Sequence, residues 1–233
     1  MKNIVLATAG ILLSGQVAAW EAGHMLVRVG ATSVSPDGGG SNLILGGTTD
    51  TGLDLSAGDN TQLGLNLAYF VSDRMAIELL AATPFKHDVN AEGTLVTDAT
   101  VQPETVVAEI THLPPTLSLN YYFTGADSAL QFYGGLGVNY TFTFDEEFNA
   151  TGASLGLDNL SVSNSYGLSY QLGVDYALDD NWSLNASARY IDIELEASMT
   201  ADGSAAPTVP AGTYTSDVEV NPYVYTLSVG YSF

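Results

Sequence analysis

Residues 63–71 read LGLNLAYFV, and every second residue from Leu63 to Val71 is large and apolar. The residues between them are mostly small or polar, as Gly64 and Asn66 illustrate. An apolar repeat of two residues is typical of a β-strand with one apolar face, because successive side chains of a strand point to opposite sides. This stretch therefore predicts a strand rather than a helix.

The same repeat of two residues recurs seven more times along the chain. The further stripes cover residues 25–31, 75–81, 117–123, 132–142, 166–176, 182–190 and 223–233. The connections alternate in length: residues 72–73, 124–129 and 179–181 are short, whereas 36–61, 84–109, 145–162 and 197–217 are long. Eight strands with short turns at one end and long loops at the other are the sequence pattern of an outer-membrane β-barrel.

The two faces of the predicted strands differ in charge. None of the stripe positions is charged, whereas the opposite positions carry small, polar and charged residues, among them Arg28, Glu78 and Asp175. A soluble lipocalin-like barrel would have the reverse arrangement, so the uncharged stripes predict an exterior that contacts lipid. The expected fold is all-β: an eight-stranded antiparallel up-and-down transmembrane β-barrel with short periplasmic turns and long extracellular loops.

Composition excludes several other classes of protein. The chain has 5 Lys+Arg against 26 Asp+Glu and no cysteine. This balance argues against a nucleic-acid partner, since phosphate binding needs clustered cations, and the lack of cysteine excludes disulfides and thiol chemistry. After residue 19, no run of 18 apolar residues occurs, so the sequence predicts no transmembrane helix.

The first residues have the pattern of a secretory signal. Lys2 provides a positive start, residues 4–13 are short and apolar, and small residues precede Trp20. We expect residues 1–19 to be a signal peptide that is removed, and residues 20–233 to form a single barrel domain.

Several longer stretches resemble one known family. They are NTQLGLNLAYFVSDRMAIELLAATPFKHDV at 60–89, THLPPTLSLNYYF at 111–123, YGGLGVNYTFTFDEEF at 133–148, VNPYVYTLSVGYSF at 220–233 and WEAGHMLVRVG at 20–30. They are similar to the OmpW family of small outer-membrane barrels, which includes the AlkL-type importers. The segments LLAATPF and HLPPTL are the most distinctive.

The resemblance implies a location and a function. A member of this family is expected in the outer membrane of a Gram-negative cell, as a channel that gives small hydrophobic molecules a passive route across the outer leaflet. It brings no enzymatic activity and no cofactor. The expected partners are small hydrophobic molecules, outer-membrane lipid and lipopolysaccharide, and the barrel-assembly machinery, which would recognise the C-terminal strand ending at Phe233.

Charged residues on the inward face predict a closed lumen. Arg28, Glu78 and Asp175 each lie three or four residues from the periplasmic end of a predicted strand, so they should share one layer. A charge inside a narrow barrel is costly unless it is paired. We expect Arg28 to lie between the two carboxylates as a salt-bridged plug, while Arg189 lies higher and needs a partner of its own. The same ion pairs could also be purely structural.

Prolines interrupt two predicted strands near their outer ends. Proline has no N–H for a β-ladder and is found at strand starts, edges or bulges. One interpretation is a lateral exit through the wall into the membrane, and the other is that the prolines merely end the strands at the outer rim. The residues that would line the exit are Ala81, Pro84, Phe85, Leu113, Pro114 and Pro115.

The seventh stripe departs from simple alternation after Tyr190. Ile191, Ile193 and Leu195 occupy the opposite phase, with acidic residues between them. Either a bulge shifts the register, or the strand leaves the membrane there. We favour the second interpretation, in which Ile191 and Ile193 line an upper, apolar part of the channel.

The histidines leave other functions open. His87 and His112 lie on facing arms of one predicted hairpin, where they could form a metal site, a base–carboxylate pair with Asp88, or plain polar rim residues. With no ligand-spaced motif, a metal site is not expected. The alternative functions are a structural or receptor barrel for phage, bacteriocin or host contact, or a lipid-modifying outer-membrane enzyme.

Overall fold

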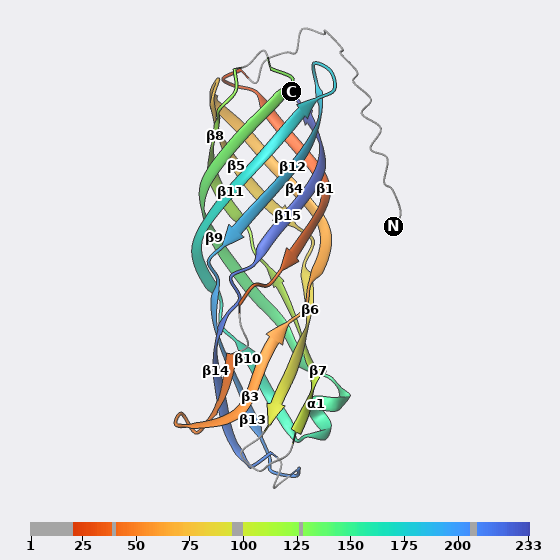
Figure 1. Ribbon diagram of the computed structural model, residues 1–233, viewed down its shortest axis with the longest axis vertical. Coiled ribbons are helices and arrows are strands. Elements are labelled where there is room, and N and C mark those ends of the chain that lie inside the picture. The colour runs from red at the N-terminus through yellow and green to blue at the C-terminus, as the bar shows by residue number, and fades with distance from the viewer. Residues whose placement is uncertain (1–20, 39–40, 95–99, 126–127, 206–208) are drawn as a thin grey trace, which may run out of the picture.

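The computed structural model describes residues 21–38, 41–94, 100–125, 128–205 and 209–233. The predicted signal peptide and Trp20 lie outside these ranges. Within them the chain is nearly all strand, in one long cylinder with the C-terminus at one end and helix α1 (Ala150–Ser154) at the other (Figure 1). No helix in the described ranges is both long and apolar enough to cross a membrane.

Eight antiparallel strands close on themselves to form the membrane barrel, as predicted. They are β1 (Met25–Ser35), β4 (Asn60–Ser72), β5 (Met75–Ala82), β8 (Thr116–Tyr122), β9 (Leu130–Phe148), β11 (Ser165–Ala177), β12 (Trp182–Ile191) and β15 (Tyr223–Ser232). Each pairs with the next in the order given, and β15 pairs with β1 from Leu26↔Ser232 to Ser35↔Tyr223. Closure leaves no unpaired edge in this part of the wall, which a barrel in lipid requires.

The side chains of this barrel are arranged inside out compared with a soluble protein. The predicted stripes lie on the outside: Leu63 is 58% exposed, Leu136 65% and Leu172 68%. The inside holds buried polar and charged residues, including Arg28 and Glu78. Only lipid tolerates a continuous apolar exterior of this extent.

Aromatic side chains gather at the end of the barrel that holds the short turns. Tyr121 and Phe123 contact each other edge to face at 5.7 Å, and Tyr231 contacts both Trp182 and Phe233 at 4.9 Å. Aromatic rings of this kind favour the membrane–water interface. They place the periplasmic boundary of the membrane at the end where the C-terminus lies.

The sequence suggested that the long connections are loops. They are instead largely strands, which extend the barrel beyond the membrane. They are β2 (Ser41–Leu45), β3 (Thr49–Ala57), β6 (Phe85–Thr94), β7 (Thr100–Leu113), β10 (Leu157–Val162), β13 (Glu194–Ala201) and β14 (Gly212–Glu219). Their pairing order is β10-β13-β14-β2-β3-β6-β7, and β7 then pairs with the extracellular end of β9. We call this part the extracellular extension; in Figure 1 it occupies the end opposite the C-terminus.

Polarity reverses where the barrel passes into this extension. On β12 and β13 the inward side chains change from buried Arg189 to buried Ile191 and Ile193, while the outward side chains change from Ala188 to exposed Glu194. Inward side chains continue to occupy every second position from Arg189 to Ile193, so the strand needs no bulge here. Because the outside changes from lipid to water at this height, the apolar face moves to the inside.

Candidate functional site

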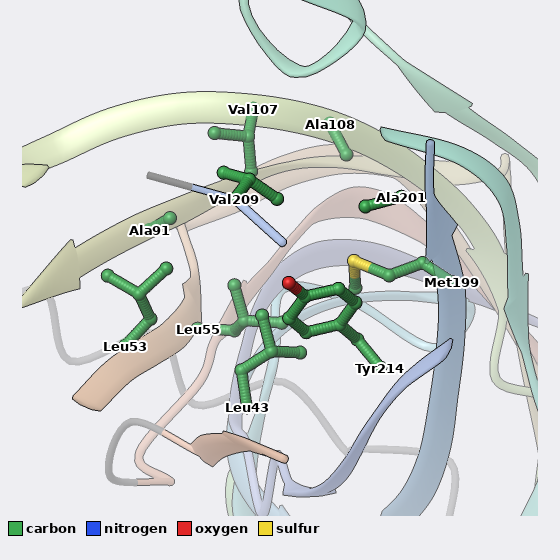
Figure 2. Packing of buried hydrophobic residues seen from close by; sticks show 10 residues of the cluster. All are labelled: Leu43, Leu53, Leu55, Ala91, Val107, Ala108, Met199, Ala201, Val209 and Tyr214. Atoms are coloured by element: carbon green, nitrogen blue, oxygen red, sulfur yellow. The ribbon is translucent and has the colours of Figure 1, made fainter. Parts of the chain in front are cut away.

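The extracellular extension encloses an apolar cavity, which we call the vestibule. Its upper wall is a cluster of buried residues contributed by six extension strands and by Val209, which precedes β14 (Figure 2). The cluster consists of Leu43, Leu53, Leu55, Ala91, Val107, Ala108, Met199, Ala201, Val209 and Tyr214. The cavity has a volume of about 140 Å³. A concave, largely apolar cavity is the usual kind of site for a small organic ligand.

The floor of the vestibule is a second apolar cluster. Phe85, Ile191 and Ile193 are each at most 2% exposed, and they pack with Val34 and Val224. Ile193 also lines the cavity itself, together with Leu195. The structure thus brings Ile191 and Ile193 to the inner surface at the height of the membrane rim.

The barrel wall is interrupted beside this floor. The β5–β8 ladder stops at Leu80↔Thr116, and the β6–β7 ladder resumes at Phe85↔His112. The chain has four residues on one side of the interruption (81–84) and three on the other (113–115). Because of the extra residue, inward-facing side chains fall on even-numbered positions up to Leu80 and on odd-numbered positions from Phe85. Residues 81–84 and 113–115 lie in this interruption, which we call the wall break, and Pro84, Pro114 and Pro115 contribute no N–H to a ladder.

The six residues predicted to line an exit all lie in or next to the wall break. Phe85 covers its inner side, where its ring stacks on His112 with centroids 5.6 Å apart. Pro84 is exposed, and Ala81 and Leu113 are half-buried. Pro114 is buried and Pro115 half-buried. The break is therefore apolar on both sides and separates the vestibule floor from the lipid-facing surface.

Asn139 on β9 holds one edge of the wall break, a role that sequence reasoning missed. Its Nδ2 donates to Pro114 O at 3.1 Å, to Pro115 O at 3.2 Å and to Thr116 Oγ1 at 3.0 Å. The backbone N–H of Tyr140 also donates to Pro115 O, at 3.1 Å. A buried carbonyl without a donor is costly, so this side chain takes the place of ladder bonds. A polar residue facing a proline pair was the available signal.

A charged network closes the lumen below the floor. Arg28 lies between Glu78 and Asp175: its Nη1 is 2.8 Å from Glu78 Oε2, and its Nη2 is 2.6 Å from Asp175 Oδ2. All three side chains are at most 1% exposed. We expected Arg189 to have a carboxylate partner of its own. It instead shares Glu78 with Arg28, and its Nη2 lies 2.8 Å from Glu78 Oε1. Two cations and two carboxylates therefore balance one another inside the barrel.

Neutral side chains satisfy the remaining carboxylate oxygens of this network. Asn120 Nδ2 and Gln171 Nε2 each donate to Glu78 at 3.2 Å, and Asn185 Nδ2 donates to Asp175 Oδ1 at 3.0 Å. A buried ion pair is tolerated when such additional hydrogen bonds complete it. We call the four charged residues and these three amides the charge plug.

An apolar layer lies between the charge plug and the periplasmic end. Leu26, Phe70 and Ala76 are fully buried there and pack with Tyr122 and Tyr133. Tyr122 joins the two layers, since its hydroxyl accepts from Arg28 Nη2 at 2.9 Å while its ring packs 5.1 Å from that of Phe70. The plug and this layer together fill the lumen with side chains, as expected for eight strands.

His87 and His112 form a stacked pair that lines the vestibule near its floor. Their ring centroids are 4.9 Å apart with an interplanar angle of 18°. Asp88 faces outward, away from the His87 ring, so the two do not form a base–carboxylate pair. Within the described ranges, no three metal-ligating side chains come together as a metal site.

The geometry agrees with what comparison with known proteins shows. The OmpW family model matches residues 21–233 of the chain. Over 235 residues, the chain is 39% identical to Outer membrane protein W of Vibrio cholerae, and the match covers 100% of both chains. It is also 28% identical to Outer membrane protein AlkL of Ectopseudomonas oleovorans, over 82% of this chain and 74% of that protein.

A solved structure supports the same assignment. The crystal structure of the outer membrane protein OprG from Pseudomonas aeruginosa matches with a TM-score of 0.83 and 37% identity, over 93% of this chain and 99% of that one. A likeness this extensive in sequence and structure confirms both the eight-stranded fold and the outer-membrane location. This chain belongs to the OmpW family of outer-membrane β-barrel proteins.

Proposed function

We propose that this barrel gives small hydrophobic molecules a passive route across the outer leaflet, with lateral exit into the membrane at the wall break. The proposal rests on three features that lie next to one another: the vestibule, the charge plug and the wall break. An apolar vestibule ends on a lumen blocked by the charge plug, and at the same height the wall is interrupted by three prolines.

The direction of travel follows from the cost of desolvation. A hydrophobic molecule gains free energy in the vestibule, at about 25 cal/mol for each Å² of apolar surface removed from water. Moving it further down the lumen would require breaking the ion pairs of Arg28, and an unpaired buried charge is costly. Sideways movement would displace Phe85, which covers the break from inside. The similarity to AlkL supports the same class of cargo.

The proposal includes the partners of the outer surface. The outward stripes would contact membrane lipid, and the exposed acidic face of the extension, with Glu194 and Glu196, would lie above the lipopolysaccharide layer. Phe233 is 68% exposed at the end of the C-terminal strand, where the barrel-assembly machinery would recognise it.

The test is uptake into asymmetric vesicles whose outer leaflet is lipopolysaccharide, with the extension facing outward. The apolar dye N-phenyl-1-naphthylamine reports arrival in the lipid by its fluorescence, and vesicle swelling reports entry of a small sugar. We expect faster dye uptake than in protein-free vesicles, with no gain in sugar permeability. Sugar permeability without faster dye uptake would contradict the proposal and indicate a small porin.

A matched pair of variants tests the exit. Replacing Pro84, Pro114 and Pro115 by valine restores three N–H donors, which allows the wall to pair, and should slow dye uptake. Pro103→Val, on β7 away from the break, is the control and should leave the rate unchanged. Equal rates in the two variants would contradict lateral exit.

A further inference from the structure

The stacked pair of His87 and His112 lies in a vestibule whose wall is largely apolar. The cavity lining is otherwise dominated by aliphatic side chains, and among its described residues there is no lysine or arginine. Phe85 continues the stack on the far side of His112. Both imidazoles thus line the vestibule next to the wall break.

Hydrogen bonding fixes what His87 can do there. Its Nδ1 lies within hydrogen-bonding distance of Gly58 O. A carbonyl oxygen only accepts, so Nδ1 carries the hydrogen, and Nε2 of the neutral ring is left as an acceptor. That Nε2 is buried and has no partner among the described residues, in a side chain that is 95% buried. The buried Nδ1 of His112 is likewise without a partner there.

Three hydroxyl groups of the vestibule are already engaged with protein oxygens. Thr141 Oγ1 donates to Asn139 Oδ1 at 2.8 Å, and Thr143 Oγ1 donates to Val162 O at 2.9 Å. Tyr214 donates to Pro210 O at 2.7 Å. None of these three can supply the donor that His87 Nε2 lacks without giving up its own bond.

Burial keeps both rings neutral under ordinary conditions. Desolvation, together with a smaller effect of the neighbouring His87, lowers the pKa of His112 to about 3. Desolvation also lowers the pKa of His87, against the opposing effects of the Gly58 carbonyl, Asp59 and Asp88. A neutral imidazole accepts a hydrogen bond, whereas a protonated one would only donate.

We propose that His87 Nε2, with His112 beside it, binds the hydroxyl group of the cargo, so that the preferred molecules are hydrophobic alcohols and phenols rather than hydrocarbons. The inference rests on the proposed function and specifies its substrate class. The hydroxyl would donate to His87 while the apolar body of the molecule lies against the aliphatic wall of the vestibule. A methyl ether of the same size has no donor and would leave Nε2 unpaired.

The experiment compares three molecules of one shape, 2-naphthol, 2-methoxynaphthalene and naphthalene. Binding to the barrel in lipid nanodiscs is measured by calorimetry, with the partition into empty nanodiscs subtracted. We expect 2-naphthol to bind about tenfold more tightly than its methyl ether, the gain that one neutral hydrogen bond gives. We also expect 2-naphthol alone to shift the ¹⁵N resonance of His87 Nε2, a readout that needs no variant.

Two variants separate recognition from packing. His87→Phe keeps an aromatic ring in the stack but has no acceptor, so it should abolish the preference for 2-naphthol while naphthalene still binds. His24→Phe replaces a histidine at the periplasmic end of the barrel, outside the vestibule, and should keep the preference. A preference that survives in His87→Phe would overturn the inference.

The outcomes also distinguish the inference from the function on which it rests. Equal binding of all three molecules by the wild-type barrel, without a shift at Nε2, would overturn hydroxyl recognition and leave the apolar route standing. If none of the three bound, the vestibule would not be a cargo site, and both the inference and the proposed function would fall.

Discussion

Arg28 binds both carboxylate oxygens of Asp175 across the lumen, with Nε at 3.0 Å from Oδ1 and Nη2 at 2.6 Å from Oδ2. The two residues are 147 positions apart in the chain and come from opposite parts of the closed sheet. A planar guanidinium matches a carboxylate in this two-bond geometry, which a lysine cannot reproduce. The pair therefore fixes the centre of the charge plug.

Arg28→Met should strongly destabilise the barrel. It leaves Asp175 without its cation and Glu78 with only Arg189, and breaking a buried pair in this way costs about 3–5 kcal/mol. The free energy of unfolding is measurable by urea titration in lipid vesicles. Arg74→Met is the control: Arg74 is exposed in the short turn before β5, and its loss should change stability by less than about 0.5 kcal/mol. Equal effects of the two substitutions would show that the plug does not stabilise the fold.

Asn139→Leu should weaken the edge of the wall break. The substitution leaves the buried carbonyls of Pro114 and Pro115 short of a donor, which costs about 1–3 kcal/mol. The amide of Tyr140, which donates to Pro115 O, should then exchange its hydrogen for deuterium faster. Asn42→Leu, at an exposed position of the extension, serves as the control. Unchanged exchange at Tyr140 would mean that Asn139 does not hold the break.

The stability of the extension should fall in acid partly because of His112. Its pKa is about 3 in the fold and 6.5 normally, so the unfolded chain takes up a proton more readily. The contribution of neutral His112 to the free energy of unfolding is fully present above pH 6.5. It is lost as pH falls towards 3, by up to about 1.4 kcal/mol for each pH unit. His112→Phe should show a smaller loss of unfolding free energy between pH 7 and pH 4.5. All other ionisable groups are common to both proteins, so the difference between the two pH profiles reports the loss of His112. Parallel pH profiles would refute this assignment.

The membrane barrel could be predicted from sequence because lipid imposes a strict rule on every strand. Leu63 and Leu172 had to face outward, and this alternation is visible without any contact information. Counting residues from the strand ends also predicted that Arg28, Glu78 and Asp175 would share a layer. The family resemblance, the fold and the location are confirmed.

The extracellular extension could not be predicted in the same way. Its strands carry bulges and reverse the polarity of the wall, so Leu53 and Tyr214 looked like isolated apolar residues in loops. The alternation of Ala197, Met199 and Ala201 was the available signal. The shared use of Glu78 by Arg28 and Arg189 depends on the three-dimensional reach of long side chains, which sequence spacing does not contain.

Lateral exit can be tested most directly by closing the wall break from the lipid side. Ala81 is half-buried on the outward face of β5 at the break, and Ala188 occupies an exposed outward position on β12, well away from it. Both can be replaced by tryptophan, and dye uptake can be compared in the lipopolysaccharide vesicles described above. Our account predicts severalfold slower uptake for Ala81→Trp and an unchanged rate for Ala188→Trp. Equal rates in the two variants, both like that of the wild-type barrel, would contradict lateral exit at the wall break.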